Sequence, residues 1–184
     1  IMAQEAVWYK TQLPLDVINS FLEETSLEEE LEESTLNGKV LIDSAVRNSR
    51  TAWVPNTHWI AGFCYHFILK ANEENFKFNI DSFGDRFIQY TSYKEGHYYN
   101  WHTDSEYGES DSVRKLSFSL QLSEPTDYTG GQLEFLTDND HRFMAPRNKG
   151  AIVIFDSRVR HRVRKITSGH RKSLVGWIEG PQWK

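Results

Sequence analysis

The hydrophobic pattern of this 184-residue chain changes its period near Asn75, and no other feature limits the fold as strongly. Before Asn75, apolar residues recur at helical spacing. After it, Phe76, Phe78 and Ile80 begin an alternation of apolar and polar residues that is typical of short strands separated by turns. Helices followed by about eight strands predict an α+β fold, in which the helices support a β-sandwich or jelly roll.

The helical part is expected to contain two helices. Pro14 suits the first position of a helix, one side of which carries Leu15, Ile18 and Leu22. The second helix is expected over about 56–71, where the apolar stripe comprises Trp59, Ile60, Phe63, Phe67 and Ile68. Between the two helices, seven of the eleven residues from Glu23 to Glu33 are glutamates, which we interpret as a solvent-exposed acidic face.

Length, charge and cysteine content narrow the class of protein. We expect one domain over residues 2–184, with helical support over about 12–72 and a strand-rich core over about 76–179. The formal net charge of −5 argues against a protein that binds nucleic acid over much of its surface. Cys64 is the single cysteine, no apolar run approaches the roughly 18 residues of a membrane span, and no signal peptide precedes Lys10. These features predict a cytoplasmic protein with no membrane partner.

The first candidate for a chemical site is the pair His102 and Asp104. Residues two apart on a strand point the same way, so both side chains can address one ion. An imidazole together with a carboxylate suits Fe(II) or Mn(II), and the absence of cysteine ligands argues against structural zinc. The alternative is a structural role, in which Asp104 bonds to a turn and His102 is a half-buried neighbour.

His161 offers a third ligand. It lies in a run where valines and His161 alternate with Arg158, Arg160, Arg162 and Arg164. On a strand, this alternation places His161 on the inner face with the valines and the arginines on the outer face. Together, His102, Asp104 and His161 form the facial triad of two imidazoles and one carboxylate that binds non-heme iron(II) and leaves three coordination positions open.

Two further runs could complete a cavity around this triad. Arg171 begins an alternating run with Ser173, Val175 and Trp177 on its face. If that face looks inward, the permanent charge of Arg171 requires an anion, and its planar fork suits a carboxylate; a salt bridge to a surface glutamate is the alternative. The run from Leu116 to Leu122 has an apolar face, and a polar face that either lines the cavity or meets solvent, made of Ser117, Ser119 and Gln121.

Four linked motifs follow one another in the second half of the chain. They are Tyr93-x-x-Gly96-x-x-Tyr99-x-x-His102-x-Asp104, Leu122-Ser123-Glu124-Pro125, Tyr128-Thr129-Gly130-Gly131-Gln132-Leu133, and His161-Arg162-Val163 with Ile166, Thr167, Gly169 and Arg171. In this order and spacing they resemble the prolyl 4-hydroxylase branch of the iron(II)/2-oxoglutarate dioxygenases, and most of all its PKHD-type hydroxylases of bacteria and phages. The resemblance implies a double-stranded β-helix, which is a form of jelly roll.

The resemblance also implies roles for individual residues. His102, Asp104 and His161 would bind Fe(II), Arg171 would pair with the distal carboxylate of 2-oxoglutarate, and Tyr93 would donate a hydrogen bond to this co-substrate. Gln121 stands where several prolyl hydroxylases carry tyrosine; with Ser119 and Trp177 it is a further candidate for the co-substrate cavity. The family's chemistry uses O2, converts 2-oxoglutarate to succinate and CO2, and hydroxylates a C–H bond, often with ascorbate as a reductant.

The resemblance favours a prolyl residue of a peptide or protein as the substrate, with a free amino acid or other small metabolite as the alternative. Tyr98, Trp101 and Tyr107 flank the expected iron site and could cover or read a substrate. The expected location is the cytoplasm, which is that of the host if a phage encodes the chain. No feature of the sequence specifies an oligomeric state.

Two other classes of function are weighed against this enzyme. A nucleic-acid-modifying enzyme is suggested by the arginine-rich run 158–164, whose side chains could contact phosphates, but the net negative charge makes a nucleic-acid partner unlikely. A non-enzymatic, cupin-like binding module would lack one ligand of the triad or Arg171, and the sequence retains all four residues.

Overall fold

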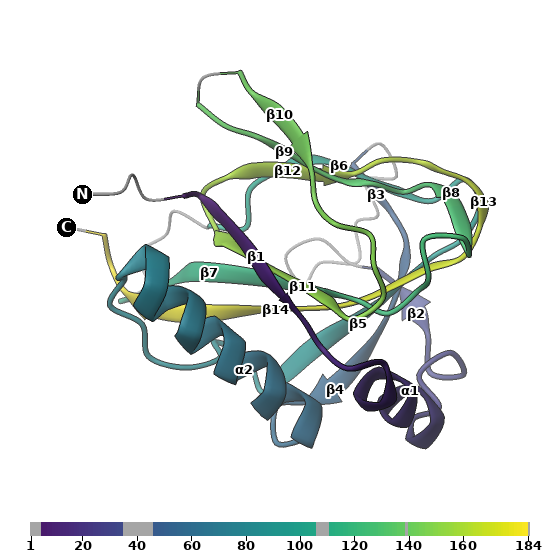
Figure 1. The fold of residues 1–184 in the computed structure, drawn as a ribbon, viewed down its shortest axis with the longest axis horizontal. Coiled ribbons are helices and arrows are strands. Elements are labelled where there is room, and N and C mark those ends of the chain that lie inside the picture. Colours follow the sequence, from purple (N-terminus) through teal and green to yellow (C-terminus); the bar gives the residue numbers. More distant parts are fainter. Residues whose placement is uncertain (1–4, 35–45, 106–110, 139, 184) are drawn as a thin grey trace.

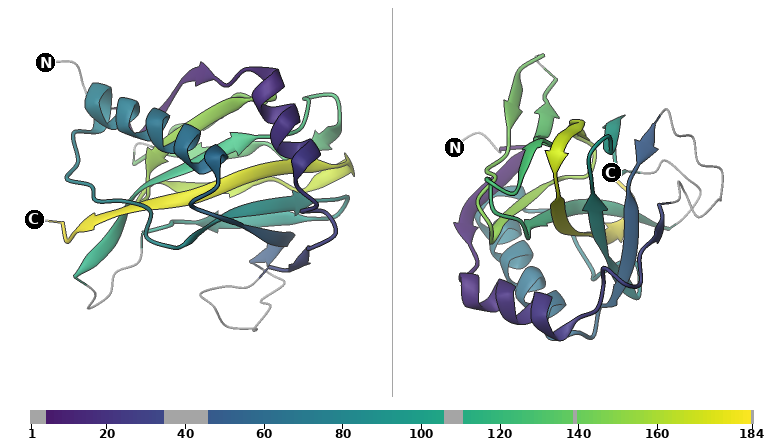
Figure 2. Two further views of the ribbon diagram at one scale, coloured as in Figure 1. Left: turned by 90° about the horizontal axis from the view of Figure 1, so that it is seen from below. Right: turned by 90° about the vertical axis from the view of Figure 1, so that its right-hand side faces the viewer.

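Two antiparallel β-sheets face each other, and two helices cover the outer side of the larger sheet (Figures 1 and 2). The structure is a computed structural model and describes residues 5–34, 46–105, 111–138 and 140–183. This architecture confirms the predicted α+β class with a jelly-roll core. Cavity-facing side chains therefore come from two sheets whose inner faces look at each other.

The larger sheet has the strand order β1-β11-β7-β14-β5-β4-β2 within the described residues, and all of its neighbouring strands are antiparallel. Its strands are β1 (Val7–Gln12), β11 (Ala151–Asp156), β7 (Ser112–Gln121), β14 (Arg171–Pro181), β5 (Phe87–Tyr93), β4 (Arg50–Pro55) and β2 (Glu32–Glu33). The long central strands β7 and β14 run side by side (Figure 1). Residues of both strands line the molecule's cavity.

The smaller sheet has the order β10-β9-β12-β6-β3 in the same part of the chain. Its strands are β10 (Arg142–Met144), β9 (Leu133–Leu136), β12 (Arg160–Val163), β6 (Tyr98–His102) and β3 (Arg47–Asn48), and a separate ribbon pairs β13 (Ile166–Gly169) with β8 (Tyr128–Gly130). A hydrophobic cluster that includes Phe135, Val153 and Phe155 fills one end of the space between the two sheets. The cavity borders this cluster, since Leu133, Phe155 and Val163 belong to both.

The helices α1 (Leu15–Glu24) and α2 (Trp59–Ala71) lie close to their predicted positions, and a π-helical turn, η1 (Asn72–Phe76), follows α2. Pro14 precedes α1 as its cap, and α2 begins at Trp59 because the side chain of His58 accepts a hydrogen bond from the Ile60 amide, at 3.2 Å. Neither helix of the described part is long and apolar enough to cross a bilayer.

The predicted apolar stripes of both helices are partly wrong. In α1 the buried residues are Ile18 and Phe21, whereas Leu15 is 46% exposed. In α2, Trp59 and Phe63 face outward, and the residues that contact the core are Ile60, Ala61, Cys64, Ile68 and Ala71. The small residues Ala61, Cys64 and Ala71 let α2 approach the sheet closely, so the bulky aromatic side chains lie on the other side.

The region expected to be helical, about 12–72, also contributes strands to both sheets. β1 pairs with β11 at one edge of the larger sheet, β4 pairs with β5, and β3 pairs with β6 in the smaller sheet. The sequence pattern does not predict β1, because the strand lacks a regular two-residue period. Val7 and Trp8 are both buried, and the register with β11 shifts between Trp8 and Thr11. β3 is too short to give any pattern.

The alternating faces of β7 and β14 agree with the prediction. Leu116, Phe118, Leu120 and Leu122 belong to the cluster that contacts the helices, together with Leu174 and Ile178 of β14. The opposite faces carry the polar residues, and these residues lie toward the smaller sheet. The two-residue period of each strand thus separates the side chains that contact the helices from those on the opposite face, of which Ser119, Arg171 and Ser173 line the cavity.

The reactivity of the Cys64 thiol reports how firmly α2 is held against the sheet. Its side chain is fully buried in the cluster beneath the helices, and this burial raises the pKa of the thiol far above its ordinary value. We expect the folded protein to react with iodoacetamide at least about a thousand times more slowly than the unfolded protein, because the thiolate forms only after α2 opens. Mass spectrometry across a urea titration measures this. Fast labelling without urea would contradict the packing.

Candidate active site

The space between the two sheets contains a cavity of about 610 Å³. Its walls include side chains of β5, β14 and β7 from the larger sheet and of β6 and β12 from the smaller sheet. This cavity brings together most of the residues singled out in the sequence: His102, Asp104, His161, Arg171, Tyr93, Ser119 and Trp177. Gln121 lies behind its wall.

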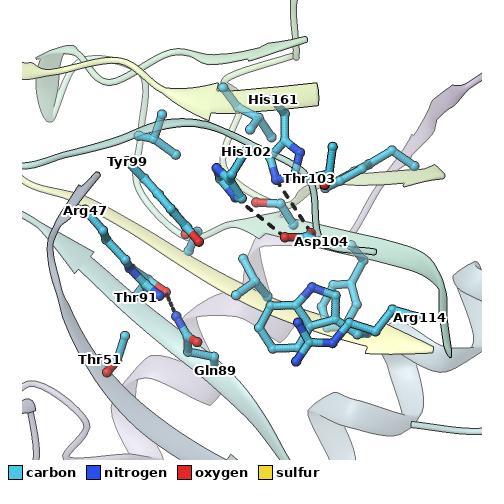
Figure 3. A pocket seen from close by; sticks show the side chains of 18 of the residues that line it. Arg47, Thr51, Gln89, Thr91, Tyr99, His102, Thr103, Asp104, Arg114 and His161 are labelled. Atoms are coloured by element: carbon cyan, nitrogen blue, oxygen red, sulfur yellow. Dashed lines mark hydrogen bonds and ion pairs between the residues drawn. The ribbon is translucent and has the colours of Figure 1, made fainter. Parts of the chain in front are cut away.

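His102, Asp104 and His161 form a compact cluster on the smaller-sheet side of the cavity (Figure 3). His102 ends β6 and His161 lies directly opposite on β12, because the two strands pair in that register. The Nε2 atoms of His102 and His161 lie 3.5 and 3.6 Å from the two carboxylate oxygens of Asp104. One potential ligand atom from each residue lies within 4.8 Å of the others. The three side chains therefore converge on a volume the size of one ion.

Backbone carbonyls orient the two imidazoles of the cluster. His102 Nδ1 lies 2.7 Å from the Asn100 carbonyl, and His161 Nδ1 lies 3.0 Å from the Val159 carbonyl. A carbonyl only accepts, so each Nδ1 carries a proton and each Nε2 is directed toward Asp104. Burial lowers the pKa of His161 to about 4, against the opposing influence of Asp104. Two Nε2 atoms and a carboxylate thus converge, an arrangement that a metal ion stabilises.

Asp104 is fixed from below by β7 and by the loop after β11. The Ser157 carbonyl accepts hydrogen bonds from the amides of Asp104 and Ser105, both at 2.9 Å, and the Ser157 hydroxyl bonds to that of Ser117 at 2.9 Å. Burial alone would raise the pKa of Asp104, but the His161 and His102 imidazoles and a hydrogen bond from Ser117 outweigh it and lower the pKa. The carboxylate is therefore ionised and held in one orientation.

Aromatic rings surround the two histidines. The rings of Tyr99 and His102 are stacked with centroids 3.5 Å apart, and Phe155 contacts His161 edge-on at 4.7 Å. Phe135 lies opposite His161 on β9 and is fully buried. These rings hold the imidazoles in one rotamer and keep water away from the side of the cluster that faces the core.

Arg171 is a buried cation without an anionic partner. Its side chain is 1% exposed, and no carboxylate of the described residues lies within salt-bridge distance of the guanidinium. Nη2 donates to Gln121 Oε1 at 2.9 Å and Nη1 donates to Ser173 Oγ at 3.3 Å, whereas Nε has no hydrogen-bond partner. A permanent charge buried in this way requires an anion in the cavity.

The remaining candidate residues surround Arg171. Tyr93 lies opposite it on β5, with the guanidinium 5.3 Å from the ring centroid. Gln121 accepts from Arg171 and donates to Ser119 Oγ at 3.0 Å, so it connects the two side chains from behind the wall. Trp177 also lines the cavity, where the Arg114 guanidinium lies 4.0 Å from the centroid of its ring.

Several cavity residues were missed in the sequence. Arg47 on β3, Gln89 and Thr91 on β5, and Arg114 on β7 all line the cavity. The inward period of β5 was available as a signal, since Gln89 and Thr91 alternate with the core residues Ile88 and Tyr90. Arg47 gave no such signal, because its direction depends on the pairing of two-residue β3 with β6.

The arginine-rich run 158–164 lies on the outside of the smaller sheet, as predicted. Part of its charge is balanced locally: Arg158 pairs with Asp156, and Arg162 pairs with Glu134, both at 2.6 Å. Arg162 also lies over the Trp101 ring at 4.6 Å. Tyr107, which was expected to flank the site, falls outside the described residues.

Comparison with known proteins agrees with this geometry. The sequence model of the 2OG-Fe(II) oxygenase superfamily matches residues 88–179, which contain both histidines, Asp104 and Arg171. A PKHD-type hydroxylase of Synechococcus sp. (strain CC9311) is 33% identical over 150 residues, which are 78% of this chain and 59% of that protein. The chain spans about half the length of the curated relatives it matches.

Solved structures share the fold. A prolyl-4-hydroxylase of Pseudomonas putida superposes with a TM-score of 0.75 at 20% identity, covering 96% of this chain and 94% of that one. A prolyl hydroxylase of Trichoplax adhaerens, solved in complex with a hypoxia inducible factor peptide fragment, gives a TM-score of 0.65 at 16% identity. It covers 89% of this chain and 75% of the other chain. Both likenesses support the jelly-roll architecture.

Proposed function

Because this chain belongs to the 2OG-Fe(II) oxygenase superfamily, we propose that it is a hydroxylase that uses Fe(II), 2-oxoglutarate and O2. One observation carries the proposal: a cluster of three ligand side chains and an unpaired, buried Arg171 face the same cavity. The cluster of ligand side chains needs a metal cation, and Arg171 needs an anion. When bound, Fe(II) and 2-oxoglutarate would supply the oxidation: one oxygen atom of O2 enters succinate, the other enters the C–H bond as a hydroxyl group, and CO2 is released.

In this proposal the residues of the chain bind and orient the reactants. His102, Asp104 and His161 hold Fe(II), and the imidazole protons stay on Nδ1, where the backbone carbonyls fix them. Arg171 binds the distal carboxylate of 2-oxoglutarate through its two terminal nitrogens. Tyr93 donates a hydrogen bond to the co-substrate, and Gln121 and Ser119 position Arg171 from the wall.

For the substrate we propose a prolyl residue of a peptide or protein. The similar proteins named above are a PKHD-type hydroxylase and two prolyl hydroxylases, one of them solved with a peptide. Trp53, which is 44% exposed, and the half-buried Trp177 both line the cavity. These two rings offer apolar surface to a pyrrolidine ring. A free amino acid or small metabolite is the competing substrate class.

We also propose the domain organisation, reductant and location of the protein. Residues 2–184 act as one domain, because both sheets and the helices share the hydrophobic clusters that enclose the cavity. Ascorbate serves as a reductant, and the location is a reducing, cytoplasmic compartment, as the single, buried Cys64 favours.

An anaerobic titration tests the cofactor chemistry. We expect a weak visible absorption band when Fe(II) and then 2-oxoglutarate are added, because the co-substrate chelates the metal through two oxygens. Neither component gives this band alone. Proline-containing peptides, free proline and single-stranded nucleic acid are then incubated aerobically with and without ascorbate, and mass spectrometry detects the gain of one oxygen. A folded protein that gives no band would contradict the proposal, and oxidation of free proline alone would exclude a peptide substrate.

A further inference from the structure

Arg47 is a second arginine that the cavity buries without an anionic partner. It is 8% exposed, and its Nε donates to Ser49 Oγ at 2.9 Å. Its guanidinium lies 4.7 Å from the centroid of the Tyr99 ring. No carboxylate of the described residues is within salt-bridge distance of it, and no hydrogen bond joins its terminal nitrogens to those residues. Arg47 lines the cavity, and within the described part of the chain only Nε of its guanidinium has a hydrogen-bond partner.

The wall opposite Arg47 is polar. Thr91 and Gln89 of β5 and Thr51 of β4, which all belong to the larger sheet, line the same cavity as Arg47 (Figure 3). Gln89 Nε2 donates to Thr91 Oγ1 at 2.9 Å, so this pair is already ordered. Arg47 itself comes from the smaller sheet. A ligand held by Arg47 would thus lie between the two sheets, with hydrogen-bonding groups on both sides.

A count of charges shows that Arg47 is in excess. The described lining residues with a formal charge are Arg47, Asp85, Asp104, Arg114 and Arg171. Arg114 and Asp85 pair with each other at 3.8 Å. In the loaded site, the two charges of Fe(II) match those of 2-oxoglutarate, and the charges of Asp104 and Arg171 cancel. Among the described lining residues, one positive charge then remains uncompensated in a largely buried cavity, which favours a substrate that brings one negative charge.

We propose that Arg47 binds a carboxylate of the substrate. Arg47 lies on Tyr99, and Tyr99 is stacked on the candidate metal ligand His102, so one ring separates the guanidinium from the metal cluster. The bound carboxylate therefore belongs to the reacting residue or to its direct neighbour. This inference rests on the proposed function and narrows its substrate class to a proline that is C-terminal or adjacent to an acidic side chain. A C-terminal carboxylate and an acidic side chain both present a carboxylate to Arg47.

Four synthetic probes separate these sources. The first pair is acetyl-Gly-Glu-Pro-Glu-Gly-amide and the same peptide with Gln in place of both Glu residues. The second pair is acetyl-Gly-Ala-Pro with a free C-terminal carboxylate and with a C-terminal amide. Binding of each peptide to the Zn(II)- and 2-oxoglutarate-loaded protein is measured by calorimetry, because Zn(II) prevents turnover. Oxidation of the same peptides is measured separately with Fe(II).

We expect the carboxylate member of at least one pair to bind about ten-fold or more tightly than its neutral partner. Arg47→Gln should remove this ratio, and Arg47→Lys should retain part of it, because lysine keeps the charge without the planar fork. Arg160→Gln is the matched control: it removes the same charge from an exposed position on the outer face of β12. Its ratio should equal that of the wild type.

The ratio of the two affinities within a pair distinguishes loss of a carboxylate site from general damage to the cavity. A loosened cavity weakens the acidic and neutral peptides alike, whereas loss of a carboxylate site weakens only the acidic one. Equal binding within both pairs by the wild type, or an unchanged ratio in Arg47→Gln, would overturn the inference even if all four peptides were hydroxylated. An Arg47-dependent ratio without any hydroxylation would support the carboxylate site and count against prolyl hydroxylation. The pair that shows the ratio identifies the source of the carboxylate.

Discussion

The Asp104→Asn protein is expected to lose metal-dependent activity while remaining folded. Asparagine keeps the shape of the side chain but removes the anionic ligand between the two imidazoles, so turnover of 2-oxoglutarate should fall by about a thousand-fold or more. Without metal, the variant should be less stable than the wild type by about 1–3 kcal/mol but still folded. The reason is that the imidazoles and the Ser117 hydroxyl, which lower the pKa of Asp104, favour an ionised carboxylate over a neutral side chain. Succinate formation and thermal unfolding measure the two effects.

Adding metal distinguishes the loss of a metal ligand in Asp104→Asn from a general folding defect. At a Zn(II) concentration about one hundred times the dissociation constant, the wild type should gain about 2.7 kcal/mol of stability, and Asp104→Asn should gain much less. Asp81→Asn is the control, because it changes the same charge at an exposed position. If Asp104→Asn retained the full stabilisation by metal, the ion would have to bind elsewhere, and the triad would have another role.

The metal-binding half of the site could be predicted from the sequence because strand alternation is a local property. His102 ends β6 and His161 lies on β12, so the directions of these two side chains follow from their own strands. Asp104 lies beyond the end of β6, where the bond from its amide to the Ser157 carbonyl fixes its position. The meeting of the two histidines across β6 and β12 depends on strand pairing. The four linked motifs, and not the alternation, indicated that pairing in advance.

Other features depended on contacts that no local pattern records. Arg47 faces the cavity because β3 adds to the edge of β6, far along the chain. The predicted stripe of α2 is right for Ile60 and Ile68, which are buried, and wrong for Trp59 and Phe63, which are apolar yet exposed. Periodicity finds a helix, but the choice of its buried side depends on how closely the helix must approach its neighbour.

Replacement of Arg171 by glutamine should weaken 2-oxoglutarate binding by about a hundred-fold, because two charge-assisted hydrogen bonds to the distal carboxylate are lost. The same change should leave the ligand-free protein equally stable or about 1–3 kcal/mol more stable, since an unpaired buried charge disappears. Glutamine can still bond to Gln121, which otherwise loses its partner. The visible band of the Fe(II) complex reports 2-oxoglutarate affinity, and urea unfolding reports stability.

Lys172→Gln provides the control for Arg171→Gln, because it removes the same charge from the neighbouring position of β14, which points away from the cavity. Both its 2-oxoglutarate affinity and its stability should match those of the wild type. Tight 2-oxoglutarate binding by Arg171→Gln would contradict the assigned role, and a large loss of stability would mean that Arg171 supports the sheet. If affinity falls while stability holds or rises, the chain keeps a buried charge at a cost to its own folding, and the reason is the anion that the charge binds.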